Sequence, residues 1–251
     1  MKKLIGFTFG GFLILTGCSS VPKAGQGIMV GEVTDTSALV QVRLARTDRL
    51  VRAEVEGPGG FSKDVPGMAG VVEFAVFTGS EPEGPLQAVA AVAGNDFIAR
   101  AVLKNLQAGK RYEVRTRIGE SAEELSAGPV ASFKTHPGAS VAASVNFVVV
   151  TGMNYGKFHG DDRIDRAIHL AQNNTELPKP YVGTDKHLGY PALASILKLK
   201  PDFFVGTGDN VYYDTPKEPR AQSIAELRQK WHEQFVQPRY RDLFAVVPTY
   251  W

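Results

Sequence analysis

The pattern of apolar residues changes near residue 137, and this change constrains the fold more than any other feature of the sequence. Before it, short alternating or apolar runs recur between turn residues, as expected for several short strands. After it, a continuous apolar run at Val145–Val150 is followed by stretches with helical periodicity. The two patterns belong to an all-β layer and an α/β layer, respectively. The sequence therefore predicts two domains, residues 28–136 and 145–251, joined by a linker at residues 137–144.

Residues 28–136 are predicted to form a sandwich of antiparallel strands. Turn residues such as Gly57-Pro58-Gly59-Gly60 and Gly94-Asn95 separate the runs. Several short strands at this spacing are typical of an immunoglobulin-like or fibronectin-type β-sandwich. The expected strands are Ile28–Val33, Ala38–Leu44, Leu50–Glu56, Val71–Phe77, Leu86–Val92, Phe97–Leu103, Arg111–Ile118 and Val130–Lys134.

Leu106–Tyr112 carries a more specific signal within this half. The segment resembles the tyrosine corner of such sandwiches, in which the phenol bonds back to upstream backbone. Tyr112 is therefore predicted to be structural. The sequence of this half brings no His, Asp and Glu residues together at metal-ligand spacing, so we expect the chemistry in the second half.

Residues 145–251 are predicted to form an α/β layer with a parallel sheet. The continuous run Val145–Val150 predicts a strand buried on both faces. Binding sites in such sheets lie beyond the carboxyl ends of the strands. His232 is interpreted as a packing or surface residue. The other expected elements are helices at Tyr190–Lys198 and Ala221–Phe235 and strands at Pro201–Val205 and Phe244–Val247.

The segment Gly208–Asp214 follows the strand Pro201–Val205 and carries the strongest chemical signal. Asp209 leaves a buried strand through a glycine, and a carboxylate placed in this way can lie between two metal ions and bind both. A tyrosine three residues later, Tyr212, can turn back and offer its oxygen, and phenolate suits a hard trivalent metal. Two metals about 4 Å apart would hold an attacking hydroxide and a phosphoryl oxygen. The neighbouring Tyr213 competes with Tyr212 for the ligand role.

The first residues predict export and lipid attachment. A basic start precedes an apolar run at residues 4–16, which is shorter than the roughly 20 residues that a transmembrane helix needs. The run leads into Leu15–Cys18, which resembles a bacterial lipobox, and the chain has no other cysteine. We therefore expect residues 1–17 to be a lipoprotein signal peptide, Cys18 to carry the lipid and residues 18–27 to form a tether. An ordinary signal peptide with a chance cysteine is the alternative.

Composition excludes two classes of protein, and the expected lipid indicates the compartment. With 43% hydrophobic residues, intrinsic disorder is a poor interpretation. Lys and Arg number 28 against 26 Asp and Glu, so the charge is nearly balanced and no nucleic-acid-binding signature is present. The lipobox resemblance implies that non-acidic residues after the cysteine, here Ser19 and Ser20, favour the outer over the inner membrane. We therefore expect a protein of the cell envelope, lipid-anchored and facing the periplasm or the cell surface.

Together these segments resemble the PhoD-like alkaline phosphatases of the metallophosphoesterase superfamily. The resemblance covers most of residues 28–251 and rests on Gly31-Glu32-Val33-Thr34, Leu106–Tyr112, Phe133-Lys134-Thr135 and Pro201–Tyr212. It implies a sandwich followed by a metallophosphoesterase domain. It also implies a phosphomonoesterase or phosphodiesterase that uses Fe³⁺ and Ca²⁺, other divalent metals being possible, and a phosphate ester as substrate.

The resemblance also implies roles for single residues. Asp209 would be the catalytic, metal-bridging carboxylate and Tyr212 the iron-binding phenolate. Asn210 is a candidate contact for a phosphate oxygen of the substrate. Where the PhoD-like pattern has a cysteine ligand after the first catalytic strand, this chain has Gly152, which offers no side-chain ligand. Asn154 is a candidate substitute, with a turn asparagine as the alternative.

Two other functions remain open. Purple acid phosphatases also join a fibronectin-like domain to a Gly-Asp-x-x-Tyr motif, and Asp214 fits their pattern, but the segment Val148–Gly152 lacks the aspartate motif that they carry there. A non-catalytic surface lipoprotein with a degenerate, incomplete phosphoesterase half is the second alternative. The next segment of the PhoD-like pattern, Asp-Asp-His, would follow Trp251, so we expect the complete protein to continue beyond this residue.

Overall fold

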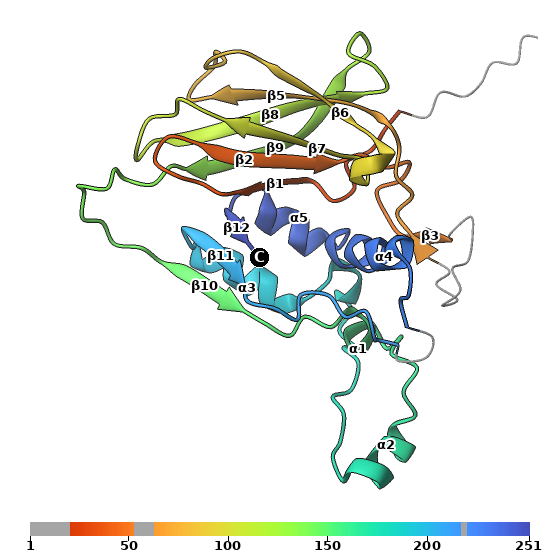
Figure 1. Ribbon diagram of the computed structural model, residues 1–251. Helices are drawn as coiled ribbons and strands as arrows, with labels where there is room; N and C mark the ends of the chain where they lie inside the picture. Colours follow the sequence, from red (N-terminus) through yellow and green to blue (C-terminus); the bar gives the residue numbers. More distant parts are fainter. Residues whose placement is uncertain (1–20, 53–62, 217–219) are drawn as a thin grey trace, which may run out of the picture.

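Seven of the described strands of the first half pair into two antiparallel sheets that face each other (Figure 1). The computed structural model describes residues 21–52, 63–216 and 220–251, so the predicted signal peptide and Cys18 lie outside the described residues. One sheet has the strand order β1-β2-β7 and the other β6-β5-β8-β9. These strands are β1 (Ile28–Gly31), β2 (Ala38–Arg43), β5 (Gly70–Phe77), β6 (Gln87–Ala91), β7 (Ile98–Leu103), β8 (Arg111–Gly119) and β9 (Ser126–Lys134).

Alternation of side chains builds the core between these sheets. On β5, Val72, Phe74 and Val76 are buried, and the residues between them are partly exposed. Every second side chain of a strand lies on one face, and the inward faces of both sheets form one apolar cluster. The predicted β-sandwich is therefore confirmed.

One of the predicted strands is described only in part. The run Leu50–Glu56 contains β3 (Val51–Arg52), which pairs with β4 (Lys63–Asp64), and residues 53–56 lie outside the described residues. The other predicted strands of this half are found with small differences at their ends. The largest is at β9, which begins at Ser126 instead of the predicted Val130.

The tyrosine corner is also confirmed. Tyr112 is fully buried, and its Oη accepts a hydrogen bond from the backbone N–H of Gln107 at 2.7 Å. Its ring stacks on Phe133 with the ring centroids 5.7 Å apart. The phenol thus satisfies a backbone donor at the corner where the chain enters β8.

The second half contains a parallel sheet of three strands, β10-β11-β12. Phe147 on β10 pairs with Phe203 on β11, and Phe204 pairs with Thr249 on β12. One face of this sheet packs against α3 and α5 in a second apolar cluster. The elements are β10 (Phe147–Val150), α1 (Tyr155–His159), α2 (Arg166–Asn173), α3 (Pro191–Leu199), β11 (Phe203–Gly206), α4 (Ile224–Phe235), α5 (Pro238–Phe244) and β12 (Thr249–Tyr250), with short 3-10 helices η1 (Ala93–Asn95) and η2 (Lys186–Leu188).

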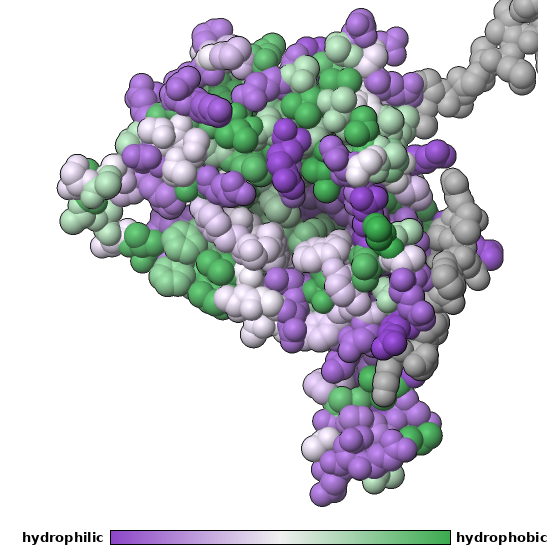
Figure 2. Space-filling model, viewed as in Figure 1, coloured by the Kyte–Doolittle hydropathy of each residue, from purple (hydrophilic) through white to green (hydrophobic). Residues whose placement is uncertain are grey.

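The prediction that the strand in Val145–Val150 is buried on both faces is wrong. Phe147 and Val149 are 52% and 53% exposed, whereas Val148 and Val150 pack on the second cluster. Among the described residues, β10 lies at the edge of its sheet and helices cover one face of that sheet. Apolar residues accordingly gather on the surface over β10 (Figure 2).

The prediction of a strand at Phe244–Val247 is also wrong. This stretch follows α5, whose residues Leu243 and Phe244 are buried, and the third strand lies further on, at Thr249–Tyr250. A short apolar run does not by itself distinguish a strand from the end of a buried helix. Pro238 at the first helical position supports the helix, because its fixed φ suits that position.

The two predicted helices of this half are confirmed as α3 and α4. The helix α4 begins at Ile224 instead of Ala221, because Ser223 forms a capping box with Glu226. The helix α2 lies at the end of an arm that projects away from the rest of the molecule (Figure 1). Within the described ranges, none of the helices is both long enough and apolar enough to cross a bilayer.

A chain of charged side chains joins α4 to the sandwich, and it corrects the interpretation of His232 as a packing or surface residue. His232 is 4% exposed, with its Nδ1 2.7 Å from Asp64 Oδ1 and its Nε2 2.7 Å from Asp96 Oδ2. Carboxylates only accept, so both contacts are hydrogen bonds when each ring nitrogen carries a proton. Arg43 extends this network of side chains, because it donates to Asp96 Oδ1 at 3.2 Å and to the carbonyl of Val65 at 2.9 Å.

Replacing Asp96 with Asn tests this network of side chains. Burial alone would raise the pKa of the Asp96 carboxyl, but the hydrogen bonds and charges of His232 and Arg43 outweigh it and hold the pKa below its ordinary value of 3.8. The substitution removes the carboxylate that Arg43 and His232 share. We expect the free energy of unfolding, measured in urea, to fall by about 3 kcal/mol.

The direction of the pKa shift of Asp96 determines how the stability difference changes with pH. Because the pKa of Asp96 is depressed in the native state, its stabilisation is present above pH 3.8 and is lost as the pH falls below that value. The difference between the parent chain and Asp96→Asn should therefore shrink in acid. Asp48→Asn, which changes an exposed aspartate, is the control and should cost little at either pH. A difference that stays constant down to acid pH would contradict the assignment.

Candidate functional site

The loops that follow β10 and β11 lie together at the carboxyl edge of the parallel sheet. The backbone N–H of Met153 donates to the carbonyl of Asp209 at 2.9 Å, and Thr151 Oγ1 donates to the carbonyl of Gly208 at 3.1 Å. Gly208 has φ +118° and Asp209 has φ +51°, so the chain turns sharply as it leaves β11. A side chain at position 208 would strain this conformation, and the glycine therefore sets the direction of Asp209.

Asp209 and Tyr212 lie next to each other on this loop, as their spacing predicts. The Tyr212 hydroxyl donates to Asp209 Oδ2 at 3.0 Å, and the Asp209 side chain is exposed. Partial burial, the hydrogen bond to Asp209 and the charges of Asp209 and Asp214 raise the pKa of the Tyr212 phenol. The phenol is thus held protonated, and a metal that binds its oxygen must displace that proton.

The structure separates Tyr212 from its competitor. The Tyr213 hydroxyl accepts a hydrogen bond from the indole Nε1 of Trp231 at 2.7 Å, so this side chain contacts α4 instead of Asp209. Sequence reasoning did not find this contact, because nothing in the spacing relates Trp231 to the loop. The ligand role of Tyr212 stays a prediction.

Asn210 follows Asp209 and is 9% exposed. Among the described residues, its buried Oδ1 has no hydrogen-bond partner. A Cβ at position 206 would lie 2.7 Å from this oxygen and 2.5 Å from the Trp251 ring, so Gly206 is needed for both side chains to approach. A buried oxygen without a donor is a group that a cation or a donor would satisfy.

Asn154 is 8% exposed, and both ends of its amide have partners. Its Oδ1 caps α1 by accepting from the N–H of Lys157 at 2.9 Å, and its Nδ2 donates to Thr215 Oγ1 at 3.2 Å. An amide oxygen has two lone pairs, so one acceptor position remains beside the cap. Gly152 has φ +77°, and a Cβ there would meet open space.

The predicted site residues offer a carboxylate, a phenol and two amides as oxygen donors, and the printed side-chain contacts of the described residues bring Asp209 and Tyr212 together. Hard cations such as Fe³⁺ and Ca²⁺ bind oxygen donors of this kind. In the part of the chain that the structure describes, no three His, Cys, Asp or Glu residues are grouped so that they could hold a metal ion. The oxygen donors of Asp209 and Tyr212 are of the kind that fits a hard metal.

Comparison with known proteins supports the fold. No family model matches the sequence, and no curated protein matches it. The solved structure of PhoD is similar, with a TM-score of 0.62 and 16% sequence identity over 93% of this chain and 39% of that chain. Two weaker likenesses are purple acid phosphatase PPD1 from yellow lupin seeds (TM-score 0.43, 14% identity, 92% of this chain and 34% of that chain) and the rat CD45 extracellular region, domains d3–d4 (TM-score 0.30, 14% identity, 54% of this chain and 67% of that chain).

The resemblance to PhoD inferred from the sequence is therefore confirmed for the fold. The chain has a β-sandwich followed by a mixed α/β region with a parallel sheet, as in the N-terminal part of PhoD. It spans 39% of the length of that protein.

Replacing Asp209 with Asn should lower the pKa of Tyr212. The substitution removes a negative charge that disfavours the phenolate and weakens the hydrogen bond that holds the phenol proton. The titration is followed by tyrosinate absorbance against pH. Subtracting the curve of Tyr212→Phe from that of the parent isolates Tyr212, and subtracting the curve of the double variant from that of Asp209→Asn gives the shifted titration. Asp202→Asn is the matched control. Identical titrations on both backgrounds would show that the Oη–Oδ2 contact is absent in solution.

Proposed function

We propose that this chain carries part of the metal centre of a PhoD-type phosphoric ester hydrolase, an alkaline phosphatase or phosphodiesterase. The observation that carries the proposal is the Tyr212 hydroxyl 3.0 Å from Asp209 Oδ2, just beyond the carboxyl end of a parallel strand. The PhoD-like fold supports it, because ligands of open α/β sheets bind at this edge.

In this proposal the oxygen donors of two adjacent loops hold the metals, Fe³⁺ and Ca²⁺ or other divalent ions. Asp209 and Tyr212 are the first ligands, and Asn154 contributes from the loop after β10. When bound, the metals supply Lewis-acid activation of water and of the phosphoryl oxygen. Asn210 contributes its unpartnered Oδ1 to a cation or its amide N–H groups to a phosphate oxygen of the substrate.

The residues themselves handle one proton. Tyr212 binds a metal only as phenolate, so its Oη must lose the proton that it now donates to Asp209. Asp209 Oδ2 already accepts that proton in a hydrogen bond and is exposed, so it can pass the proton to solvent. Metal uptake should therefore release protons and weaken as the pH falls.

Asp209→Asn tests the proposal in the protein as purified from its native cell envelope. We expect it to lose bound iron, measured by elemental analysis, and to lose hydrolysis of p-nitrophenyl phosphate and bis(p-nitrophenyl) phosphate on the order of a hundredfold or more. Asp48→Asn, with the same change of charge at an exposed position outside the site, is the control and should retain both metal and turnover.

The alternative of a non-catalytic surface module makes the opposite prediction. A parent protein that binds no metal and hydrolyses neither ester would overturn the enzyme proposal and favour that module. Turnover that survives in Asp209→Asn would place the metal centre elsewhere.

We also propose that Cys18 anchors the protein to the outer membrane by a lipid, facing the periplasm or the cell surface. The sequence Leu15–Cys18 supports this anchoring. Each buried CH₂ of an acyl chain contributes about 0.8 kcal/mol, so several chains give a stable anchor.

The localisation is tested by Cys18→Ser. This variant should lose the acyl mass from its N-terminal peptide and should no longer sediment with the membrane fraction, whereas Ser19→Ala should keep both properties. Membrane sedimentation that survives in Cys18→Ser would contradict lipid anchoring through this residue.

A further inference from the structure

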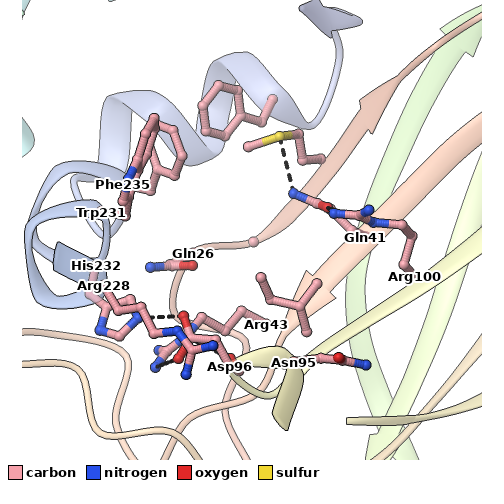
Figure 3. Close-up of a pocket in the computed structure, with 14 residues that line it drawn as sticks. Gln26, Gln41, Arg43, Asn95, Asp96, Arg100, Arg228, Trp231, His232 and Phe235 are labelled. Atoms are coloured by element: carbon pink, nitrogen blue, oxygen red, sulfur yellow. Dashed lines mark hydrogen bonds and ion pairs between the residues drawn. The ribbon is translucent and has the colours of Figure 1, made fainter. Parts of the chain in front are cut away.

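A cleft of about 570 Å³ lies between the sandwich and α4 (Figure 3). One wall comes from β2 and β7, where Gln41 pairs with Arg100 across the two strands. The opposite wall is one face of α4, formed by Arg228, Trp231, His232 and Phe235 at spacings of three and four residues. Its volume is that of a site for a small organic molecule.

The carboxylates at one end of the cleft already have partners. Asp96 contacts both Arg43 and His232, and Asp64 contacts the other ring nitrogen of His232. This buried network occupies the end of the cleft, so a ligand would be held by the other side chains that line it.

Two further guanidinium groups line the cleft and have no carboxylate partner among the described residues. Arg100 donates through Nε and Nη2 to the amide oxygen of Gln41, at 3.3 and 3.0 Å. Arg228 donates only to the carbonyl of Gly94, at 3.4 Å. A guanidinium has five N–H donors, so both side chains keep donors for an anion. The amide of Gln26 lies between the two walls, with no hydrogen-bond partner among the described residues (Figure 3).

Apart from Asn95, the remainder of the lining is apolar. Trp231 and Phe235 pack together with their ring centroids 5.2 Å apart, and Phe244 and Met29 continue this surface. Trp231 and Phe235 are only partly buried, so their rings are available to a ligand. Aromatic rings of this kind contribute much of the binding energy at small-molecule sites.

We propose that this cleft binds a small organic anion, with its acidic group held by Arg228 or Arg100 and its aromatic or alkyl body against Trp231 and Phe235. The cleft lies against α4 and the sandwich, and Asp209 and Tyr212 do not line it. It is therefore separate from the proposed metal centre, and the proposal does not depend on that function. The acidic group is a phosphate ester or another acid such as a carboxylate or sulfonate.

Fluorescence of 8-anilinonaphthalene-1-sulfonate, an aromatic anion, tests the proposal on the purified chain. We expect saturable binding whose Kd rises about tenfold in Arg100→Gln or Arg228→Gln and more in the double variant. Arg49→Gln removes an exposed arginine outside the cleft and should leave the Kd unchanged. A double variant that binds the probe as tightly as the parent chain overturns the proposal.

A second pair of variants distinguishes the cleft from the open face of β10, where the dye could also bind. Gln26→Trp fills the cleft without changing its charge, and it should abolish binding. Phe147→Ser alters the exposed apolar face and should leave binding intact. The opposite result is that dye binding is kept in Gln26→Trp and lost in Phe147→Ser. Binding that is kept in Gln26→Trp overturns the proposal whether or not Phe147→Ser folds. Far-ultraviolet circular dichroism establishes which variants fold.

Competition identifies the acidic group. Phenylphosphonate that displaces the dye at lower concentration than benzenesulfonate and phenylacetate indicates a phosphate-type ligand, and equal displacement by all three indicates an organic acid of any kind. Inorganic phosphate that competes as well as phenylphosphonate would show that the aromatic wall contributes nothing, and it would overturn the proposal.

Discussion

The hydrogen bonds of His232 to Asp64 and Asp96 set the position of α4, and much of the molecule depends on that helix. Gln234 Nε2 donates to the carbonyl of Met153 at 3.1 Å, and Lys230 Nζ donates to the carbonyl of Thr215 at 3.0 Å. The helix therefore touches the sandwich through one set of side chains and both loops of the candidate site through another. Burying polar and charged groups costs desolvation energy, which this network offsets by giving Arg43 and His232 carboxylate partners. These contacts hold α4 in one position relative to the sandwich.

The sequence predicted well those features whose signals are local. Alternation within each strand of the sandwich is such a signal, and so is the spacing that brings Tyr212 back to Asp209. Tyr112 was assigned correctly because a tyrosine corner is a contact over five residues. Within the candidate site, the contact of Tyr212 with Asp209 could be predicted in this way, because the motif specifies its own loop. The contacts of that loop with the rest of the chain could not.

The errors share a cause, which is that burial depends on neighbours distant in the sequence. The apolar run at Val145–Val150 has the composition of a doubly covered strand, but its place at the sheet edge leaves Phe147 in contact with solvent. Near Phe244, four apolar residues fit a strand or a helix equally well, and packing of α5 against α3 decided between them. His232 is 136 residues from Asp96, so no window of sequence could pair them.

The helix α4 contacts both the cleft against the sandwich and the two loops of the candidate site. Arg228, Trp231 and Phe235 face the cleft, while Lys230 and Gln234 bind the loops on the other side. With 3.6 residues per turn, a shift of register by one residue would rotate these side chains by about 100° and break both sets of contacts. Trp231 belongs to both, since it lines the cleft and donates to Tyr213 beside Tyr212. The position of the candidate-site loops and the shape of the cleft thus both depend on α4 and on the contacts of His232.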